Sequence, residues 1–374
     1  MATRTPLPVD LVASAGIEGI PLARIWGDEM PPYYQSWVSK SQSELESSFS
    51  GIMNTEHTYL ALSGGGPRGA YGAGVIVGWT EAGTRPEFTV VTGVSVGALT
   101  APFAFLGPDY DDILEKLYTE HFTSDLVKKR NLFITAIWRD SIVSTDPLKE
   151  IIADFIDEKM VKNLAAEYKK GRRLYVITTN LDASRPVMWN IGAIAASESV
   201  KALGLIHDVI LASASIPGLM PPVYIEVEAN GEYYDEMHVD GGTSTQVMFY
   251  PTGVDIRLID KKLRVEGRPT IYVIRNGRFN SPYEPVKPKL LPIAIRSVDS
   301  LLLAQGKGDL SRIYFSTRRD DIDYRLTFIP SDFDVVPEEV GGLEYMKQLF
   351  TLGRRLGKDG TAWREAPPDV VGIP

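Results

Sequence analysis

Two strand-turn-helix units that follow one another near the start of the chain limit its fold more than any other feature. The first is Leu60 to Gly74, LALSGGGPRGAYGAG, and the second is Phe88 to Gly107, FTVVTGVSVGALTAPFAFLG. In each, a short apolar run leads through a glycine turn into a helix of small residues. Alternation of strands and helices builds a parallel sheet with crossover helices. The sequence therefore predicts an α/β protein with a mainly parallel central sheet.

The same alternation is predicted to continue through the 374 residues, which suit one large α/β domain with an appended segment. We expect an extended N-terminal strap over 1–57, a main domain over 58–251 and a C-terminal strand and helix extension over 252–374, packed on the same domain. Further helices are predicted near 110–120, 147–155, 205–216, 292–314 and 342–356, and further strands near 172–192, 222–225, 233–240, 269–277 and 324–330.

The composition excludes several classes of function. With 39 basic and 48 acidic residues the formal net charge is −9, which argues against a nucleic-acid partner because phosphate-reading surfaces are basic. The absence of cysteine excludes disulfides, thiolate metal sites and cysteine nucleophiles. No apolar run approaches the ~18 residues needed to span a bilayer, and the N-terminus lacks the apolar core of a signal peptide. We therefore expect the chain as given to be soluble.

The first glycine turn matches a dinucleotide-binding pattern by its letters. Gly64, Gly66 and Gly69 have the G-x-G-x-x-G spacing between a strand and a helix, where backbone N–H groups attract either a pyrophosphate or a transient oxyanion. The dinucleotide pattern also needs an acidic residue at the end of the next strand, for the ribose. That strand ends instead in Thr92 and Gly93. Dinucleotide binding therefore stays only as an alternative.

The second turn carries a G-x-S-x-G sequence. Gly93, Ser95 and Gly97 stand between the strand and the helix of the second unit, which is the setting of a nucleophile elbow. The two glycines have no Cβ, so the strand and the helix can approach closely while the serine hydroxyl is exposed on the turn. Ser95 is therefore the candidate nucleophile, with a plain turn as the alternative.

A serine nucleophile needs a base, and histidine is the usual one. A Ser-His-Asp esterase of the α/β-hydrolase type would need a histidine that follows an acid late in the chain. None of the histidines has the setting of such a catalytic loop, so we interpret each as structural and keep the triad as an alternative. The histidines are His57, His121, His207 and His238, and the acids that would serve them are Asp111, Asp157 and Asp182.

Asp240 is the stronger candidate for the base. It ends a strand-like run and is followed by Gly241 and Gly242, which allow close backbone approach. A carboxylate at the carboxyl end of a strand faces the same edge of the sheet as the Ser95 elbow. An ordinary Asp, with a pKa of ~3.9, is a weak base, so the site would have to be desolvated. The alternative is a turn aspartate that caps its own loop.

The motifs GGGPRGAYGAG, GVSVG and DGG together resemble those of the patatin-like phospholipases, which are related in active-site plan to the cytosolic phospholipases of animals. The resemblance covers roughly Thr58 to Pro251, including ASASIPGLMPPV ahead of the aspartate. It implies a three-layer α/β/α fold and a catalytic domain over 58–251. It also implies hydrolysis of acyl esters by a serine-aspartate dyad, without a metal or another cofactor.

Carried over by position, the resemblance makes Ser95 the nucleophile and Asp240 the general base. The backbone N–H groups of Gly65, Gly66 and Arg68 would form the oxyanion hole. Pro67 has no N–H, so the hole must use the neighbours of this residue.

The function that this resemblance implies is lipid acyl hydrolysis of the phospholipase A or carboxylesterase type, in lipid catabolism. The expected partner is a lipid or ester substrate, met at a membrane surface or in solution, and the oligomeric state is left open. The segment IPLARIWGDE resembles arms of bacterial members made with an export or lipoprotein signal. This favours the cell envelope or periplasm, with the cytoplasm as the alternative. A non-catalytic lipid-binding protein is the remaining alternative.

Overall fold

A nine-stranded sheet forms the middle layer of the computed structural model, which describes residues 4–121, 145–281, 283–335 and 342–370. Its main path runs in the order β1-β5-β4-β3-β2-β8-β9, and a hairpin of β6 and β7 joins it at β4. The strands are β1 (Arg24–Trp26), β2 (Glu56–Leu62), β3 (Val90–Val94), β4 (Arg173–Asn180), β5 (Arg185–Asn190), β6 (Val223–Ala229), β7 (Glu232–Asp240), β8 (Glu266–Arg278) and β9 (Asp323–Ile329).

Five consecutive strands of this path, β4, β3, β2, β8 and β9, run parallel to one another. The strands β1, β5, β6 and β7 pair antiparallel at the side of β4. This arrangement follows from the connections, because the central strands are joined by crossover segments whereas β4 to β5 and β6 to β7 are joined by short turns. The prediction of an α/β fold with a mainly parallel sheet is confirmed.

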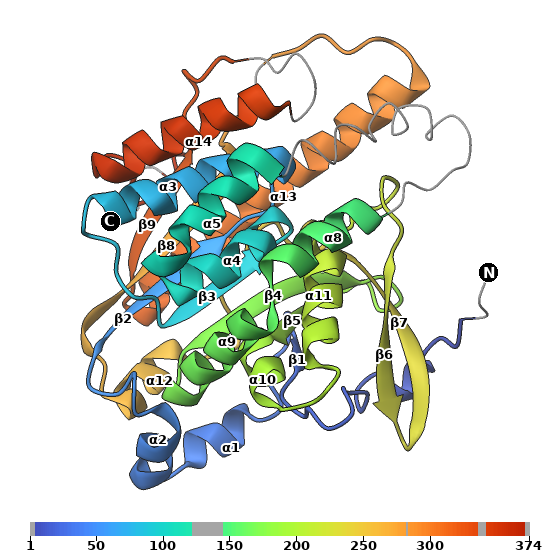
Figure 1. Ribbon diagram of the computed structural model, residues 1–374, viewed down its shortest axis with the longest axis vertical. Coiled ribbons are helices and arrows are strands. Elements are labelled where there is room, and N and C mark those ends of the chain that lie inside the picture. The colour runs from blue at the N-terminus through green and yellow to red at the C-terminus, as the bar shows by residue number, and fades with distance from the viewer. Residues whose placement is uncertain (1–3, 122–144, 282, 336–341, 371–374) are drawn as a thin grey trace.

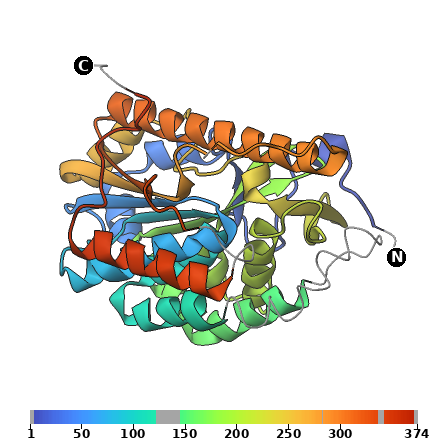
Figure 2. The ribbon, with the colours of Figure 1, turned by 90° about the horizontal axis from the view of Figure 1, so that it is seen from above.

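Helices cover both faces of the sheet, as the view from above shows (Figure 2). One face carries α13 together with α1, α2 and α12, and the other carries α3, α14 and the helices of the middle of the chain (Figure 1). The helices are α1 (Tyr34–Ser39), α2 (Gln42–Phe49), α3 (Gly69–Glu81), α4 (Val96–Leu106), α5 (Asp111–Lys116), α8 (Asp146–Phe155), α9 (Glu158–Lys170), α10 (Ile191–Ala196), α11 (Ala202–Ser213), α12 (Ile256–Leu263), α13 (Leu290–Asp320) and α14 (Leu343–Lys358). The molecule therefore has the three layers that were predicted.

The last helix, α14, packs against α3, which belongs to the first strand-turn-helix unit. Met346 and Leu349 are fully buried, and Phe350 is nearly so. Small residues let the two backbones approach, since a Cβ added at Gly78 or Gly353 would overlap the main chain of the other helix. The C-terminal segment is thus tied to the body of the fold through a helix pair.

The N-terminal segment is not extended throughout, contrary to the expectation of an extended strap. It contributes β1 to the sheet and then forms α1 and α2. Ser41 and Glu44 make a reciprocal capping box at the start of α2, with Glu44 N–H donating to Ser41 Oγ and Ser41 N–H donating to Glu44 Oε2. This S-x-x-E pattern was readable in the sequence and marks the start of the helix.

Several element boundaries differ from the predictions, and two helices are the clearest cases. The helix α11 ends at Ser213, four residues before Pro217, because the chain turns there to bring Ser215 beside β7. The helix α13 extends from Leu290 to Asp320 and is longer than the predicted 292–314. Within the residues that the structure describes, no helix is both long and apolar enough to cross a bilayer.

Candidate active site

Ser95 occupies the turn between β3 and α4 in a strained backbone conformation. Its φ of 55° and ψ of −125° lie outside the regions that non-glycine residues normally adopt. The turn is tight, because a Cβ at Gly93 would lie 2.5 Å from the carbonyl oxygen of Gly97, and one at Gly97 would lie 2.5 Å from that of Leu62. The glycines of the motif therefore permit the close contact of strand and helix that was predicted from their spacing.

A hydrogen-bond chain holds this turn against the neighbouring strand. The backbone N–H of Ser95 donates to Oγ of Ser213 at 2.9 Å, and that hydroxyl donates to the carbonyl oxygen of Ile177 in β4 at 2.6 Å. Ser213 is the last residue of α11 and is completely buried. The strained turn is thus supported by a residue that sequence reasoning did not single out.

The structure brings Ser95 and Asp240 together. Oγ of Ser95 donates a hydrogen bond of 2.6 Å to Oδ2 of Asp240. The two residues do not meet in the way that the sequence predicted, with Asp240 at the end of another parallel strand. The strand β7, which ends in Asp240, runs antiparallel to β4. Only His238, Val239 and Asp240 pair with β4, and they pair with its last three residues. The strand β7 therefore approaches from beyond the carboxyl edge of the sheet and ends beside Ser95.

The surroundings of Asp240 fix its second oxygen and alter its acidity. The N–H of Gly242 donates to Oδ1 at 2.7 Å, which leaves Oδ2 for the serine. The backbone N–H of Asp240 donates to the carbonyl oxygen of Ser215 at 2.9 Å. Burial raises the pKa of Asp240 to about 6, although the hydrogen bonds from Ser95 and Gly242 act in the opposite direction. A carboxylate of this kind can accept a proton near neutral pH.

The glycine turn that follows β2 lies directly against Ser95. A Cβ at Gly64 would stand 3.2 Å from Cβ of Ser95. No described residue accepts a hydrogen bond from the N–H of Gly65 or Gly66, whereas the N–H of Arg68 donates to the carbonyl oxygen of Gly65 at 3.3 Å. Of the three predicted oxyanion donors, two are therefore without an acceptor and the third takes part in its own turn.

Asn276, near the end of β8, holds this turn in place and was missed by sequence reasoning. Its Nδ2 donates to the carbonyl oxygen of Ser63 at 2.9 Å, and its Oδ1 accepts from the N–H of Gly72 at 3.1 Å. Its backbone N–H donates to Oγ of Ser63 at 2.8 Å. Asn276 itself is buried. The signal in the sequence was an amide side chain within an apolar strand, PTIYVIRNG.

A second link connects the glycine turn to the Asp-Gly-Gly turn. The carbonyl oxygen of Gln246 accepts from Gly64 N–H at 3.0 Å, and Nε2 of Gln246 donates to the carbonyl oxygen of Gly242 at 2.8 Å. Asp309 of α13 in turn accepts from the N–H of Gln246 at 2.6 Å and from Oγ1 of Thr245 at 3.1 Å. The position of both turns therefore depends on α13.

The histidines of the described residues make structural contacts. Nε2 of His57 lies 2.8 Å from the carbonyl oxygen of Ile52, and Nε2 of His207 lies 2.7 Å from that of Ile156. The side chain of His121 lies outside the described residues. The acids considered for a triad have other partners: Asp111 accepts from Arg85, Asp157 caps α9 and Asp182 pairs with Arg4.

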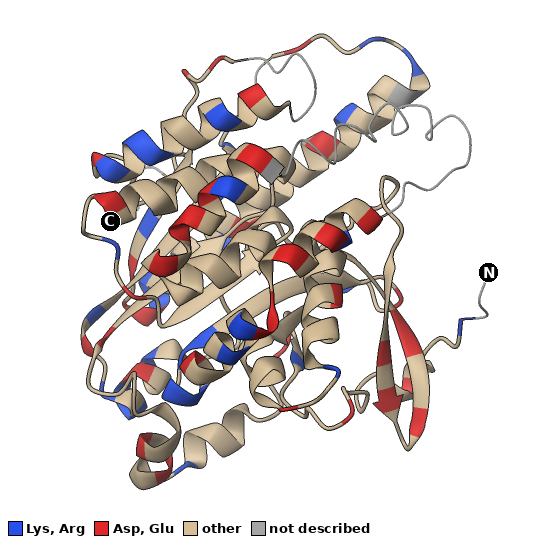
Figure 3. Ribbon diagram, viewed as in Figure 1, with Lys and Arg blue, Asp and Glu red and all other residues tan. Residues whose placement is uncertain are grey.

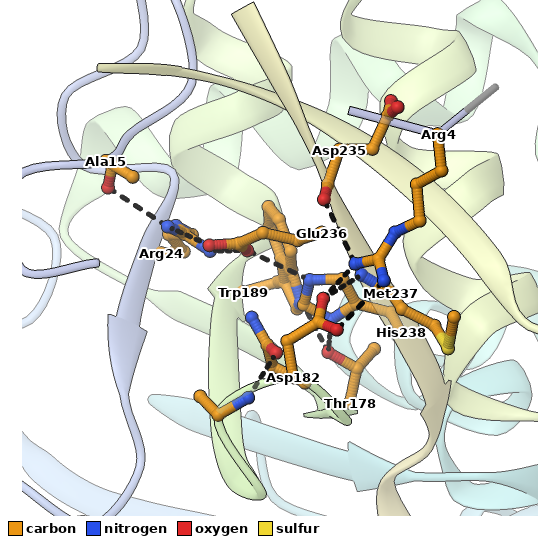
Figure 4. A network of polar contacts seen from close by, with 12 residues as sticks. Arg4, Ala15, Arg24, Thr178, Asp182, Trp189, Asp235, Glu236, Met237 and His238 are labelled. Atoms are coloured by element: carbon orange, nitrogen blue, oxygen red, sulfur yellow. Dashed lines mark hydrogen bonds and ion pairs between the residues drawn. The ribbon is translucent and has the colours of Figure 1, made fainter. Parts of the chain in front are cut away.

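His238 belongs to a buried polar network behind β7 (Figure 4). Its Nε2 lies 3.1 Å from Oε2 of Glu236, and its Nδ1 lies 2.9 Å from Oγ1 of Thr178, which also accepts from Trp189. Arg24 of β1 forms an ion pair with Glu236. Burial lowers the pKa of His238, while the hydrogen bond to Glu236 acts against that shift. His238 therefore links β7 to β4 and does not contact Ser95, whereas Arg24 joins the N-terminal segment to β7.

Comparison with known proteins gives one match to a family. The family described as "Patatin-like phospholipase" matches residues 60–251, which include Ser95, Asp240 and both glycine turns. No curated protein matches the chain.

Several solved structures resemble the fold at low sequence identity. VipD from Legionella pneumophila is 15% identical with a TM-score of 0.37, and the match covers 83% of this chain and 67% of VipD. Human GIVD cytosolic phospholipase A2 is 9% identical with a TM-score of 0.32, covering 67% of this chain and 48% of that one. ExoU of Pseudomonas aeruginosa, solved in complex with SpcU, is 14% identical with a TM-score of 0.29, and the match covers 81% of this chain and 52% of that one. The chain thus spans about two thirds of the first and about half of the other two.

Proposed function

This chain belongs to the patatin-like phospholipase family, a family of lipid ester hydrolases, and from that premise we propose that it cleaves acyl esters with Ser95 as nucleophile and Asp240 as general base. The observation that carries the proposal is the 2.6 Å hydrogen bond from Oγ of Ser95 to the buried carboxylate of Asp240. The raised pKa of Asp240 supports the role of base, because catalysis needs a group that exchanges protons near neutral pH.

In the first half of the reaction, Oγ of Ser95 attacks the carbonyl carbon of the ester while Oδ2 of Asp240 takes the hydroxyl proton. The tetrahedral intermediate collapses when the bond to the leaving alcohol breaks, and Asp240 returns the proton to that alcohol. In the second half, water attacks the acyl-enzyme and passes a proton to Asp240. The proton then returns to Ser95 as the carboxylic acid leaves.

The oxyanion of each tetrahedral intermediate would be bound by the N–H groups of Gly65 and Gly66. Both lack an acceptor within the described residues, and they lie in a turn packed on Ser95. The N–H of Arg68 would have to leave its hydrogen bond to Gly65 before it could contribute. Loss of one such donor typically slows the chemical step by about 10²–10³-fold.

A fluorophosphonate probe, which reacts with activated serines, tests the nucleophile and the base. We expect labelling of the wild-type protein, none in Ser95→Ala, and strongly reduced labelling in Asp240→Asn. The matched control is Ser47→Ala, which removes an exposed hydroxyl in α2, away from the turn, and should be labelled as the wild type is. Labelling that persists in Ser95→Ala, or turnover that is unchanged in Asp240→Asn, would refute the dyad.

Alanine at His57, His207, His238 and, separately, His121 discriminates the dyad from a Ser-His-Asp triad. The dyad requires that none of these variants abolishes turnover of a short soluble ester. A protein that binds lipid without catalysis would show no turnover that depends on Ser95. The substrate class can be identified by mass spectrometry of the fatty acids and lysolipids released from a mixed phospholipid extract.

A further inference from the structure

The first half of α13 extends beyond the sheet that the second half covers. The helix has 31 residues, so it is about 46 Å long, whereas the seven residues of β9, to which it leads, span about 23 Å. The second half packs on the sheet through Leu310 and Ile313. From Leu290 to Gln305 none of the residues with a described side chain is buried, and Gly306 is the first buried position. About half of this helix therefore projects from the body of the protein (Figure 1).

The projecting half lies at the edge of the sheet that carries the candidate active site. The helix α13 connects the end of β8 to the start of β9, and these strands are parallel to each other. Its first residues therefore lie beyond the carboxyl ends of the strands. Ser95 follows the end of β3, and Asp240 pairs with the final part of β4, so both are at this same edge.

The projecting half exposes an apolar face. Ile295, Val298 and Leu302 have the i, i+3, i+7 spacing of one helix face, which in a globular protein normally packs against a core. Val298 is 53% exposed and Leu301, beside it, is 69% exposed. Ser300 lies on the other side of the helix. An exposed apolar surface of this kind marks a site of interaction.

Two further features surround this face. Lys287 and Lys289 precede the helix, as does Tyr283, which is 95% exposed. Figure 3 shows positive charge just before the start of α13, whereas the first half of the helix carries few charged residues. At the same edge, the loop after α11 exposes Ile216 and Leu219 next to Ser215, whose carbonyl oxygen accepts from Asp240. Apolar side chains flanked by lysines and a tyrosine are the composition of a membrane-interface segment.

We propose that the projecting half of α13, residues 290–305, docks on a lipid surface that contains anionic phospholipid, with Lys287 and Lys289 at the headgroups. The proposal rests on the proposed function, because it places the edge with Ser95 against the layer that holds the substrate. Anionic headgroups would pair with Lys287 and Lys289, and the aliphatic side chains of the exposed face would enter the apolar layer. A second copy of the chain is an alternative occupant that the test below separates from a lipid surface.

Vesicle binding of the full chain tests the proposal without catalysis. The Ser95→Ala protein is mixed with vesicles of phosphatidylcholine alone, or of phosphatidylcholine with phosphatidylglycerol, and bound protein is measured by co-sedimentation. We expect binding to the anionic vesicles that falls on the order of tenfold when Val298→Glu or Leu301→Glu is added. The matched control is Ser300→Glu, which adds the same charge on the other side of the helix and should retain binding. The double variant Lys287→Gln, Lys289→Gln should bind anionic vesicles more weakly than the Ser95→Ala parent protein does. Its binding to vesicles of phosphatidylcholine alone should be unchanged.

Binding that is equal in Val298→Glu and Ser300→Glu would overturn the proposal, as would a wild-type chain that does not bind the vesicles. A concentration-dependent dimer of the wild-type chain that Val298→Glu disperses would identify a second copy as the occupant and overturn it too. Turnover of a short soluble ester by the wild-type chain separates this proposal from the proposed function. If the wild-type chain binds vesicles but does not hydrolyse the soluble ester, only the proposed hydrolase function is contradicted. If Val298→Glu and Leu301→Glu hydrolyse the soluble ester as fast as the wild type but no longer bind vesicles, both proposals are supported.

Discussion

Oγ of Ser95 lies 2.6 Å from Oδ2 of Asp240, and the two residues expose only 6% and 5% of their surfaces. Ser95 adopts a strained conformation, and the carboxylate has no cationic partner among the groups that affect its pKa. The protein therefore maintains a strained, poorly solvated pair, which is the kind of arrangement that functional sites retain at a cost in stability.

The pH dependence of turnover should follow Asp240. The carboxyl group must be ionised to accept the proton of Ser95, and burial raises its pKa to about 6. We therefore expect kcat/KM for a soluble ester to rise with pH through about 6 and then to level off. The control is His207→Ala, in which the rise should stay at the same pH. A profile that moves or disappears in this variant would contradict the assignment.

Asp240→Asn should abolish turnover and stabilise the folded protein. The folded pKa of Asp240, about 6, is above the value of 3.8 for an exposed Asp, so the unfolded chain loses this proton first as the pH rises. The wild-type protein therefore loses stability between about pH 4 and pH 6, and the asparagine variant does not. Urea unfolding should give similar free energies for both at pH 4 and a variant more stable by about 1–3 kcal/mol at pH 8. Equal free energies at pH 8 would show that burial of the carboxylate carries no such cost.

Alanine substitutions at Gly65 and Gly66 should have different effects on catalysis, because only the first would displace the turn that holds the predicted oxyanion donors. A Cβ at Gly65 would overlap the carbonyl oxygen of Asn276, so Gly65→Ala must displace the turn. At Gly66 nothing lies within 4 Å, and only the φ of 56° is unfavourable, at about 1 kcal/mol. We expect kcat to fall by about 10²-fold or more in Gly65→Ala and much less in Gly66→Ala. Comparable losses in the two variants, measured at equal folded fraction, would argue against this account of the turn.

Asn276 should act as a positioning residue for the glycine turn. Asn276→Ala removes the side-chain hydrogen bonds to Ser63 and Gly72 and leaves buried backbone groups unpaired, at about 1–3 kcal/mol of stability. We expect kcat to fall by about tenfold to 100-fold with KM little changed, because the turn would matter most in the transition state. Asn280→Ala is the control, since Asn280 is exposed and follows the same strand. A rise in KM alone would indicate a role in substrate binding instead.

The ion pair of Arg24 and Glu236 should stabilise the attachment of the N-terminal segment. Burial would raise the pKa of Glu236, but hydrogen bonds and charge from His238 and Arg24 lower it to about 2. This contribution is therefore present at neutral pH and is lost only as the pH falls from about 4.5 towards 2. Arg24→Met should cost about 3–5 kcal/mol at pH 7, because it leaves a buried carboxylate without its cation.

A matched surface pair provides the comparison for Arg24. Arg185→Met breaks the more exposed ion pair with Asp28 and should cost no more than about 1 kcal/mol. Adding Glu236→Gln to Arg24→Met should recover part of the loss, since it removes the uncompensated charge. Additive losses in the double variant would show that Arg24 acts through its packing on Trp26 and Trp189 and not through the ion pair.

The local pattern of the chain predicted the elements around the site well. A short apolar run that ends in glycine and leads into small residues favours a strand, a turn and a helix, so β2, α3, β3 and α4 were predicted in kind and in order. Family membership followed from the same motifs and is confirmed by the match over residues 60–251. The roles of Ser95, Asp240 and the oxyanion donors stay predictions, although the first two meet in the fold.

The residues that support the site could not be predicted in the same way. Asn276, Gln246 and Ser213 hold the site through hydrogen bonds to Ser63, Gly64 and Ser95, respectively. These partners are from 118 to 213 positions away, so no local period or spacing reveals the contacts. The sequence also assumed that Asp240 ends a strand parallel to β3, whereas β7 enters from the opposite direction.

The strand-turn-helix units, the turn that carries Ser95 and the Asp-Gly-Gly turn could all be predicted from the chain, because each depends on residues that are neighbours along it. The fold was needed to learn how Asp240 reaches Ser95, which N–H groups lack an acceptor among the described residues, and that half of α13 projects beyond the sheet. These depend on the direction of β7, on hydrogen bonds between distant segments and on the length of one element against another, which are set by packing.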